Sequence, residues 1–259
     1  MSGFEVEKLC ALYGRKQVLF EVTLPALADG EILGILGPNA SGKSTMIRCL
    51  AREMPASGTV RLDGRDQSAI GRDDWYAKVA TMPQMPPAPS ALLPTELMWS
   101  TARALNLEFS DRELAAHIEA IFLRLGLDEL ALSPLQTLSG GKRQLVGFAL
   151  TLIRDPELML LDEPTSALDL YWRMIVLDLV RDRLTEHGGI AIAALHDLDL
   201  AARYCDRLVL LEEGRVLAAG TPREVLTAAN LAQLYRVEAE VSDDAEGRLR
   251  IHVVRPLSG

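Results

Sequence analysis

The residues with the clearest chemical potential lie in one loop, Gly37-Pro-Asn-Ala-Ser-Gly-Lys-Ser44. This loop fits the pattern G-x-x-x-x-G-K-[ST], in which glycines let successive backbone N–H groups face phosphate oxygens. The N-terminus of a following helix adds partial positive charge, the lysine adds a full charge, and the serine hydroxyl can reach Mg²⁺. The pattern therefore predicts a triphosphate cradle formed by Gly37, Pro38, Asn39, Ala40, Ser41, Gly42, Lys43, Ser44 and Thr45. A tight turn without a ligand is the alternative.

Two adjacent carboxylates, Asp162 and Glu163, follow the apolar run Leu158-Met-Leu-Leu161. Open α/β sheets bind ligands beyond the carboxyl ends of their strands, which is where this pair would lie. We expect Asp162 to hold Mg²⁺, through water, and Glu163 to polarise or deprotonate the water that attacks a terminal phosphate. Alternatively, the pair only caps the segment after the strand.

A third candidate element is Leu138-Ser-Gly-Gly-Lys-Arg-Gln144, which precedes the apolar stretch 145–153. Ser139 is a favourable N-cap residue, and the N–H groups at the start of a helix form an anion site. Ser139, Gly140 and Gly141 could thus contact a phosphate. On its own, this sequence is more simply explained as a capped helix after a loop.

Short apolar runs predict the sheet that must position these residues. Ile32–Leu36 is apolar almost throughout, as a strand buried on both faces of a mostly parallel sheet would be, and it leads into the glycine loop. A helix is expected after the loop, at 43–51, and another at 171–187, in the order of a βαβ unit. The other predicted strands are 4–9, 18–24, 59–62, Val79–Met82, 158–161, Ile190–Ala194 and 208–211.

A proline-rich segment interrupts this pattern. Met85-Pro-Pro-Ala-Pro89, together with Pro94, cannot continue a helix or a central strand, so it predicts a boundary before a helical region at about 95–154. Residues 111–125 have apolar side chains at helical spacing, with Ser110 or Asp111 as the cap. Alternating runs at 237–241 and 249–254 predict a terminal hairpin.

The composition limits the class of protein. The 259 residues suffice for one large α/β domain, and the net charge of −9 disfavours binding to nucleic acid. No run reaches the roughly 18 apolar residues of a membrane span, and the first ten residues lack the features of a signal peptide, so a cytosolic protein is expected. Cys10, Cys49 and Cys205 are expected to be buried, reduced thiols.

Together, the phosphate loop, Ser139-Gly140-Gly141 and the acidic strand resemble the ATP-binding-cassette (ABC) ATPases over essentially the whole chain. The resemblance implies an α/β fold: a P-loop NTPase core with a mostly parallel sheet, helices on both faces, an N-terminal antiparallel β part and an inserted helical subdomain. One domain would span 1–259. Its catalytic core would comprise 1–84 and 155–220, its helical subdomain 85–154, and its C-terminal extension 221–259.

The resemblance also assigns roles to residues outside the three motifs. Tyr13 would stack on adenine, Gln84 would link Mg²⁺ to the surface that faces a membrane partner, His196 would contact the γ-phosphate, and Asp169 would lie at a dimer contact. The implied catalytic residues are Glu163, His196, Gln84 and Lys43, and the implied Mg²⁺ ligands are Ser44, Gln84 and Asp162.

In this family, the LSGGQ-like sequence of one subunit closes over the γ-phosphate held by the phosphate loop of the other. The resemblance thus implies ATP and Mg²⁺ as cofactors, hydrolysis of ATP to ADP and phosphate, and a second cassette subunit, with a homodimer favoured. Lys142 stands where the family often has Gln or Glu, and this departure concerns the ribose-side contact.

Three kinds of cassette protein compete: the ATPase of an importer, the ATPase of an exporter, and a soluble ABC ATPase without a transport role. The segment between Lys43 and Ser139 has no sustained heptads, which disfavours DNA-repair relatives. A single phosphate loop disfavours translation-type relatives, and the lack of an apolar span disfavours a fused exporter. An importer subunit is favoured, peripheral on the cytoplasmic side of the cell (inner) membrane, with transmembrane permease subunits and, indirectly, a solute-binding protein as partners.

The end of the chain favours one class of importer. Gly220-Thr-Pro-Arg-Glu-Val-Leu-Thr227, Leu231-Ala-Gln-Leu-Tyr235 and the hairpin resemble the ending of the iron-siderophore, haem and cobalamin importer ATPases. Residues 85–106 would then form the docking surface for a cytoplasmic helix of the permease. Its candidate apolar contacts are Met85, Leu92, Leu93, Met98 and Trp99, and the alternative is that these side chains only pack the helical subdomain.

Overall fold

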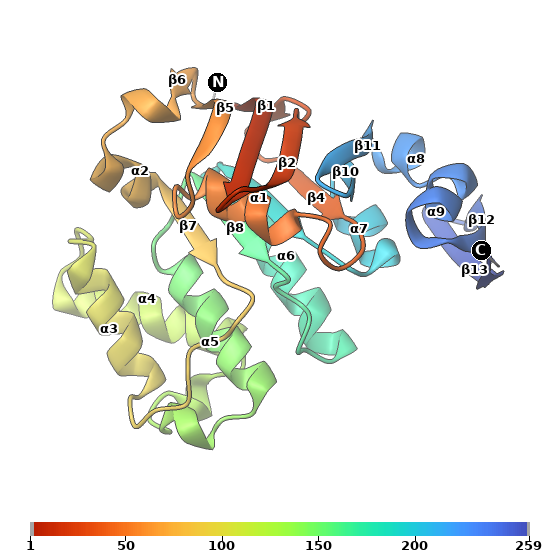
Figure 1. Ribbon diagram of the computed structural model, residues 1–259. Helices are drawn as coiled ribbons and strands as arrows, with labels where there is room; N and C mark the ends of the chain where they lie inside the picture. The colour runs from red at the N-terminus through yellow and green to blue at the C-terminus, as the bar shows by residue number, and fades with distance from the viewer. Residues whose placement is uncertain (1–2, 258–259) are drawn as a thin grey trace.

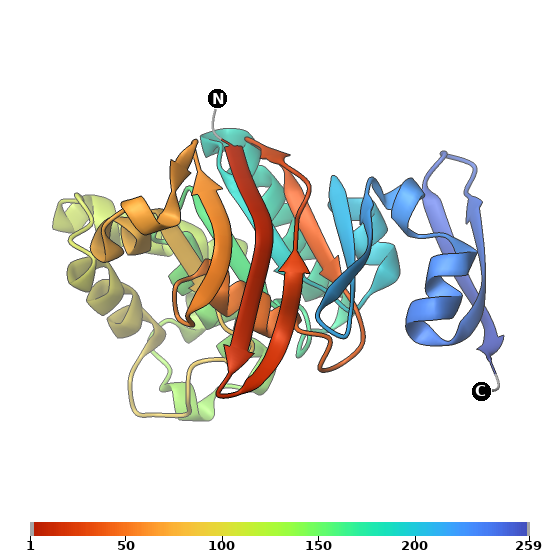
Figure 2. The same cartoon turned by 45° about the horizontal axis from the view of Figure 1, so that its top comes forward.

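The computed structural model describes residues 3–257. Its N-terminal sheet is antiparallel, with the order β2-β1-β5-β6 and with β3 paired to β1. The strands are β1 (Gly3–Tyr13), β2 (Lys16–Val22), β3 (Leu27–Ala28), β5 (Ala56–Leu62) and β6 (Arg65–Asp66). Figure 2 shows this sheet, in red and orange, in front of the rest of the core. The expected antiparallel β part is confirmed.

The second sheet has six strands in the order β11-β10-β4-β9-β8-β7. They are β4 (Ile32–Leu36), β7 (Val79–Met82), β8 (Leu158–Asp162), β9 (Ile190–Ala194), β10 (Arg207–Glu212) and β11 (Arg215–Gly220). Neighbours from β10 to β7 are parallel, and only the edge strand β11 runs antiparallel. Because β4, β8 and β9 are buried at every position, the mostly parallel sheet is covered on both faces, as their apolar runs predict.

Helices follow the strands and cover the sheet on both sides (Figure 1). They are α1 (Lys43–Leu50), α2 (Arg72–Lys78), α3 (Pro94–Ala104), α4 (Asp111–Arg124), α5 (Gly140–Leu152), α6 (Leu170–His187), α7 (Leu198–Tyr204), α8 (Pro222–Val225) and α9 (Ala228–Tyr235). Three short 3₁₀ turns complete the list: η1 (Gln67–Ala69), η2 (Asp128–Leu130) and η3 (Leu135–Thr137). No helix among residues 3–257 is both long and apolar enough to cross a membrane.

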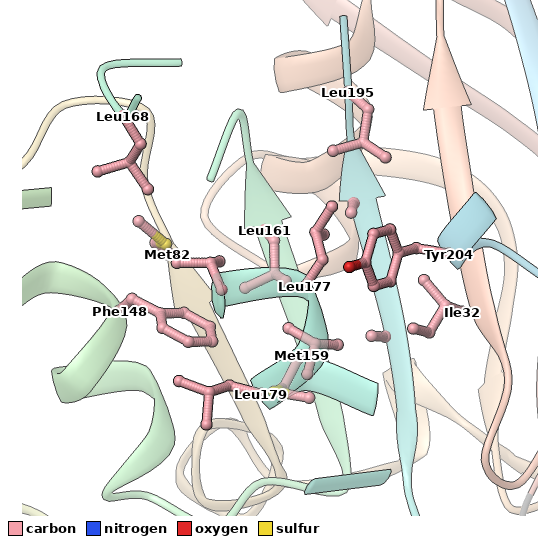
Figure 3. Packing of buried hydrophobic residues seen from close by; sticks show 14 of the residues in the cluster. Ile32, Met82, Phe148, Met159, Leu161, Leu168, Leu177, Leu179, Leu195 and Tyr204 are labelled. Carbon is pink, nitrogen blue, oxygen red and sulfur yellow. The ribbon is translucent and has the colours of Figure 1, made fainter. Parts of the chain in front are cut away.

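The parallel sheet separates two hydrophobic cores. On one face, Leu158 and Leu160 of β8 join the cluster that α1 and the antiparallel sheet complete. On the other face, Met159 and Leu161 pack with Phe148 of α5 and with side chains of α6, as Figure 3 shows. Alternate residues of each strand thus point to opposite cores, and the sheet is held in place from both sides.

The helices α3, α4 and α5 lie together on one side of the molecule, away from the antiparallel sheet (Figure 1). Pro94 is the first residue of α3, a position where a missing N–H is tolerated, so this proline begins a helix as well as ending the preceding loop. Ser110 and Glu113 form a capping box at the start of α4, with Glu113 N–H donating to Ser110 Oγ over 3.3 Å. The predicted start of this helix is confirmed.

The last elements are α8, α9 and a hairpin of β12 (Val237–Asp243) and β13 (Leu249–Pro256), which confirms the predicted hairpin. Both views place them at one end of the molecule, beyond β10 and β11.

The cysteine prediction is correct for Cys49 and Cys205, which are buried and free. It is wrong for Cys10, which lies at a register shift between β1 and β2 and is only partly buried.

Candidate functional site

The loop between β4 and α1 encloses a cavity of about 370 Å³. The cavity is lined by residues 39–45 of the loop, by Lys16 and Val18 of β2, and by Gln84 and Glu163. Two loop glycines are required by the backbone path. Gly42 has a φ of +109°, and a Cβ at Gly37 would lie 2.3 Å from the carbonyl oxygen of Leu211.

Lys43 begins α1 and is buried inside this loop, with 5% of its surface exposed. Its Nζ donates hydrogen bonds to the carbonyl oxygens of Gly37, over 2.7 Å, and Pro38, over 3.1 Å. Burial lowers the pKa of Lys43, while the nearby carboxylates of Glu163 and Asp162 act in the opposite direction. The lysine is thus held over the cavity, where it can exchange carbonyl contacts for phosphate oxygens.

Asp162, the last residue of β8, faces Ser44 at the start of α1. Its Oδ1 accepts a hydrogen bond from Ser44 Oγ over 3.0 Å, and the side chain is buried. Burial raises the pKa of Asp162, and the hydrogen bond from Ser44 opposes this shift. Two hard oxygen donors therefore lie side by side at the end of the phosphate loop, a donor set that suits Mg²⁺.

No cluster of three or more His, Cys, Asp or Glu side chains that could hold a metal occurs among residues 3–257. Mg²⁺ usually keeps several waters and binds through one or two carboxylates together with substrate phosphates. The pair Ser44 and Asp162 fits that mode of binding.

Glu163 turns away from the direction of β8, because its backbone has a left-handed φ of +53°. One carboxylate oxygen accepts a hydrogen bond from Gln84 Nε2 over 2.9 Å, and the other lies 2.5 Å from His196 Nε2. A left-handed non-glycine residue costs energy, and such residues gather at functional sites. Gln84 follows β7 and His196 follows β9, the two strands next to β8. The Glu163 carboxylate lies between these two side chains.

The structure thus brings six predicted site residues to one edge of the parallel sheet. They are Lys43, Ser44, Gln84, Asp162, Glu163 and His196. The carboxyl ends of β4, β9, β8 and β7 are neighbours in the strand order, and this is why segments far apart in sequence converge.

Four other predicted residues and Tyr13 lie outside this group of six, and none of these five lines the cavity. Ser139 caps α5 by accepting a hydrogen bond from Lys142 N–H over 3.3 Å, and Gly140 beside it faces open space. Asp169 is exposed and caps α6. These four residues lie at the starts of α5 and α6: Ser139, Gly140, Gly141 and Asp169.

Tyr13 is 49% exposed at the end of β1, and its hydroxyl accepts a hydrogen bond from the Arg48 side chain. It pairs across the sheet with Lys16, which does line the cavity, so the tyrosine lies next to the rim.

The Lys142 side chain of α5 points toward α6. Its Nζ donates a hydrogen bond to the Gly126 carbonyl oxygen over 3.2 Å and lies 4.5 Å from the ring centroid of Trp172 in α6. A cation over an indole face is attracted by the ring. Lys142, which stands where the family often has Gln or Glu, therefore links α5 to α6. Ser139 still caps the start of α5.

Gln144 is a site residue that the sequence analysis missed. It is buried in α5, its Nε2 donates to the carbonyl oxygen of Glu163 over 2.9 Å, and its Oε1 accepts from Ala167 N–H over 2.9 Å. The side chain thus fixes the loop that follows Glu163 to the helix that begins at Ser139. The available clue was its place directly before the apolar stretch 145–153, at the end of the motif that begins at Leu138.

We expect Gln144→Ala to lower the free energy of unfolding by about 2 kcal/mol, because the Glu163 carbonyl and the Ala167 N–H lose their partner and the buried amide is removed from the core. Urea unfolding measures this change. Gln136→Ala is the matched control: Gln136 is exposed in the same region, and its replacement should change stability by less than about 0.5 kcal/mol. Equal losses in both variants would contradict the role of Gln144 in fixing the loop.

The comparisons with known proteins agree with this geometry. A model of the ABC transporter family matches residues 23–166, and the chain belongs to this family. A hemin import ATP-binding protein of Plesiomonas shigelloides is 36% identical, over 92% of this chain and 97% of its own length. An iron(3+)-hydroxamate import ATP-binding protein of Bacillus subtilis is 35% identical, over 94% of this chain and 91% of its own length.

A solved structure of an inward-facing metal-chelate type ABC transporter contains a similar chain, with a TM-score of 0.79 and 25% identity, over 100% of this chain and 98% of that one. The predicted fold class and family are therefore confirmed. Within the family, the chain is an ATP-binding subunit, an ATPase whose hydrolysis energises membrane transport.

Proposed function

We propose that this chain powers an importer whose cargo is an iron–siderophore complex, haem or cobalamin. The observation that carries the proposal is likeness over nearly the full length to ATP-binding proteins named for hemin and iron-hydroxamate import. The cavity at the phosphate loop and the carboxylate beside it supply the chemistry that such a subunit needs.

In the proposed site, the backbone N–H groups of residues 37–45 and the ammonium group of Lys43 hold the phosphates of ATP. Ser44, Asp162 and Gln84 hold Mg²⁺, which supplies neutralising charge at the phosphate oxygens when it is bound. Tyr13, beside the rim, stacks on the adenine.

Glu163 accepts a proton from the attacking water or polarises it, because its carboxylate lies at the rim of the phosphate cavity. Gln84 orients one carboxylate oxygen, and His196 orients the other while it reaches toward the γ-phosphate. The left-handed backbone at Glu163 places this carboxylate away from the buried Asp162, so that the two acids have separate tasks.

A second copy of the chain completes the site in this proposal. Ser139 and Gly140 are exposed at the start of α5, with open space beside Gly140, while Gly141 is partly buried against Ala167; all three lie outside the cavity of their own chain. Such a helix start attracts anions, so we assign it to the γ-phosphate held by the partner subunit, with Asp169 at the contact between the two subunits.

We expect Ser139→Arg to leave ATP binding by the monomer unchanged and to weaken ATP-driven dimerisation by about tenfold or more. A bulky side chain at the centre of an interface and a lost phosphate contact each cost on the order of 1–3 kcal/mol. Analytical ultracentrifugation with ATP measures the dimer, with Ser100→Arg, an exposed serine of α3, as control. Normal dimerisation of Ser139→Arg would argue against a shared site.

The permease docks, in this proposal, at an apolar cavity of about 430 Å³ between the end of β7, α3 and α5. Met85, the residue after Gln84, is 81% exposed at this cavity, and Pro86 and Leu105 also line it. Closure of the dimer would thus be transmitted from Glu163 through Gln84 to the cytoplasmic helix of the permease.

The predicted docking residues need one correction. Met98 is completely buried in the core between the helices, because it lies on the inner face of α3, and it cannot contact a permease. Leu92 is exposed, while Leu93 and Trp99 are partly buried. Met85 and Leu92 are therefore the stronger candidates.

We assign separate roles to the predicted segments. Residues 1–84 and 155–220 form the catalytic core, 85–154 the helical subdomain that carries the phosphate contact for the partner, and 221–259 the C-terminal extension. The assembly pairs two copies of the chain with transmembrane permease subunits on the cytoplasmic side of the cell membrane, and a solute-binding protein delivers the cargo.

Purification of the tagged chain from gently extracted membranes of its own cells, followed by mass spectrometry, tests this proposal. We expect a permease with several membrane spans, and a solute-binding protein with it. Recovery of soluble partners only, or of a permease without any solute-binding protein, would instead favour a soluble ABC ATPase or an exporter.

A further inference from the structure

Trp172 connects the first turn of α6 to the first turn of α5. Its backbone N–H donates a hydrogen bond to Asp169 Oδ1 over 3.1 Å, so Asp169 caps the helix in which Trp172 lies. The indole ring is partly buried and packs against the hydrophobic cluster that includes Phe148 of α5. The exposed end of α6 is therefore joined directly to a residue whose ring reaches the helical subdomain.

Two groups of the helical subdomain contact this ring. Lys142 Nζ lies 4.5 Å from the ring centroid, a distance at which a cation is attracted by an aromatic face. Gly126, just after α4, lies against the benzene part of the indole: a Cβ there would be 2.5 Å from Trp172 Cη2, so a side chain at this position would displace the ring. The Gly126 carbonyl oxygen also accepts the hydrogen bond from Lys142 Nζ. The ammonium group thus contacts both an indole and a carbonyl oxygen.

Lys142 also joins this contact to the helix start at Ser139. Its backbone N–H donates to Ser139 Oγ over 3.3 Å, while its side chain reaches Trp172. In the proposed dimer, Ser139 contacts the γ-phosphate held by the partner subunit, and Asp169 lies at the contact between the subunits. Ser139 and Asp169 are each one hydrogen bond away from the pair Lys142 and Trp172. The pair therefore helps to set the spacing of two groups that must meet the same partner.

Other contacts of α5 reach the loop that follows Glu163. A Cβ at Gly141 would lie 2.8 Å from the Ala167 carbonyl oxygen, and Gln144 Oε1 accepts a hydrogen bond from Ala167 N–H. These contacts hold α5 against the loop, whereas the Lys142 side chain reaches α6 itself. Loss of the Lys142 ammonium group should therefore loosen the placement of α6 relative to the start of α5 without breaking either helix.

We propose that Lys142 and Trp172 are positioning residues for the closure of the ATP-bound dimer. Their contact already sets the spacing of Ser139 and Asp169 in the monomer, and such preorganisation reduces the ordering cost of binding a partner. This inference rests on the proposed shared site, in which Ser139 and Asp169 face a second copy of the chain.

Lys142→Met is the decisive variant, because methionine keeps an unbranched side chain and removes the charge. We expect the dissociation constant of the ATP-bound dimer to rise about three- to tenfold, within the roughly thirtyfold that two lost cation–π contacts could cause. Analytical ultracentrifugation with ATP measures it. ATPase activity should need more subunit to reach its plateau, while the plateau itself and the ATP affinity of the monomer stay at wild-type values.

Two further variants test the chemistry of the contact. Lys142→Arg keeps a cation over the ring and should dimerise as wild type does. Arg72→Met is the matched control: it removes a cation 5.3 Å from the ring centroid of Tyr76 in α2, outside this junction, and should leave dimerisation unchanged.

A double-mutant cycle shows whether the two residues act through one contact. In the Trp172→Leu background, Lys142→Met should weaken the dimer by less than about twofold. Wild-type dimerisation of Lys142→Met, or additive effects of the two substitutions, would overturn the inference. A lower unfolding midpoint of Lys142→Met together with weaker ATP binding by the monomer would also overturn it, by showing a general structural role.

Ser139→Arg, measured alongside, separates this inference from the shared site. If Ser139→Arg fails to dimerise while Lys142→Met matches wild type, the positioning role is wrong and the shared site stands. If Ser139→Arg dimerises normally, the shared site itself fails, and the positioning role fails with it.

Discussion

Glu163→Gln is expected to bind ATP as tightly as wild type and to hydrolyse it about a hundredfold more slowly or worse. General-base catalysis contributes roughly 10²- to 10⁴-fold, and glutamine keeps the size of glutamate while losing its proton affinity. The Glu163 carboxylate lies at the rim of the phosphate cavity, 2.5 Å from His196 Nε2, and among residues 3–257 it is the one carboxylate that lines this cavity. Because binding persists without turnover, this variant should also accumulate as an ATP-bound dimer.

Single-turnover hydrolysis and equilibrium ATP titration separate the two effects. Glu186→Gln, which neutralises an exposed carboxylate of α6, serves as the control and should hydrolyse ATP at the wild-type rate. Turnover of Glu163→Gln near that of the control would remove Glu163 from the water-activating role.

Lys43→Ala is expected to weaken ATP binding by about ten- to a hundredfold. A hydrogen bond to a charged group contributes about 1.5–3 kcal/mol, and each 1.4 kcal/mol corresponds to a factor of ten in affinity. Lys43 is buried beneath the loop, and its charge is poorly hydrated there, so a phosphate is a favourable partner for it.

Titration with a fluorescent ATP analogue checks this prediction. Lys16→Ala should weaken ATP binding less than Lys43→Ala does. Lys16 lines the same cavity but is exposed, and a solvated charge contributes less. Affinity of Lys43→Ala equal to wild type would contradict the phosphate-binding role of the loop.

Much of the fold could be predicted because its determinants are local. The apolar run at Ile32–Leu36 and the loop of glycines after it specify a buried strand and a tight turn through nearby residues alone. The same holds for the Ser110 capping box. The meeting of Gln84, Glu163 and His196 at one edge then follows from the order of parallel strands.

Other features depend on tertiary contacts, and sequence patterns do not encode them directly. The left-handed backbone of Glu163 is one example, and the contacts of its carboxylate with Gln84 and His196 come from segments far apart in sequence. Met98 is apolar and lies in a segment with exposed neighbours, and only the packing of α3 shows that it is buried.

Transport in proteoliposomes that contain the chain and its co-purified permease would show whether this ATPase powers import. ATP is supplied only on the side that bears the chain, and a ferric siderophore, haem or cobalamin is supplied with the solute-binding protein on the other side. We expect cargo to accumulate on the side with ATP, and we expect vesicles with Glu163→Gln to transport none. Movement of cargo away from the ATP side, or ATP hydrolysis with no transport of any of these compounds, would contradict this expectation.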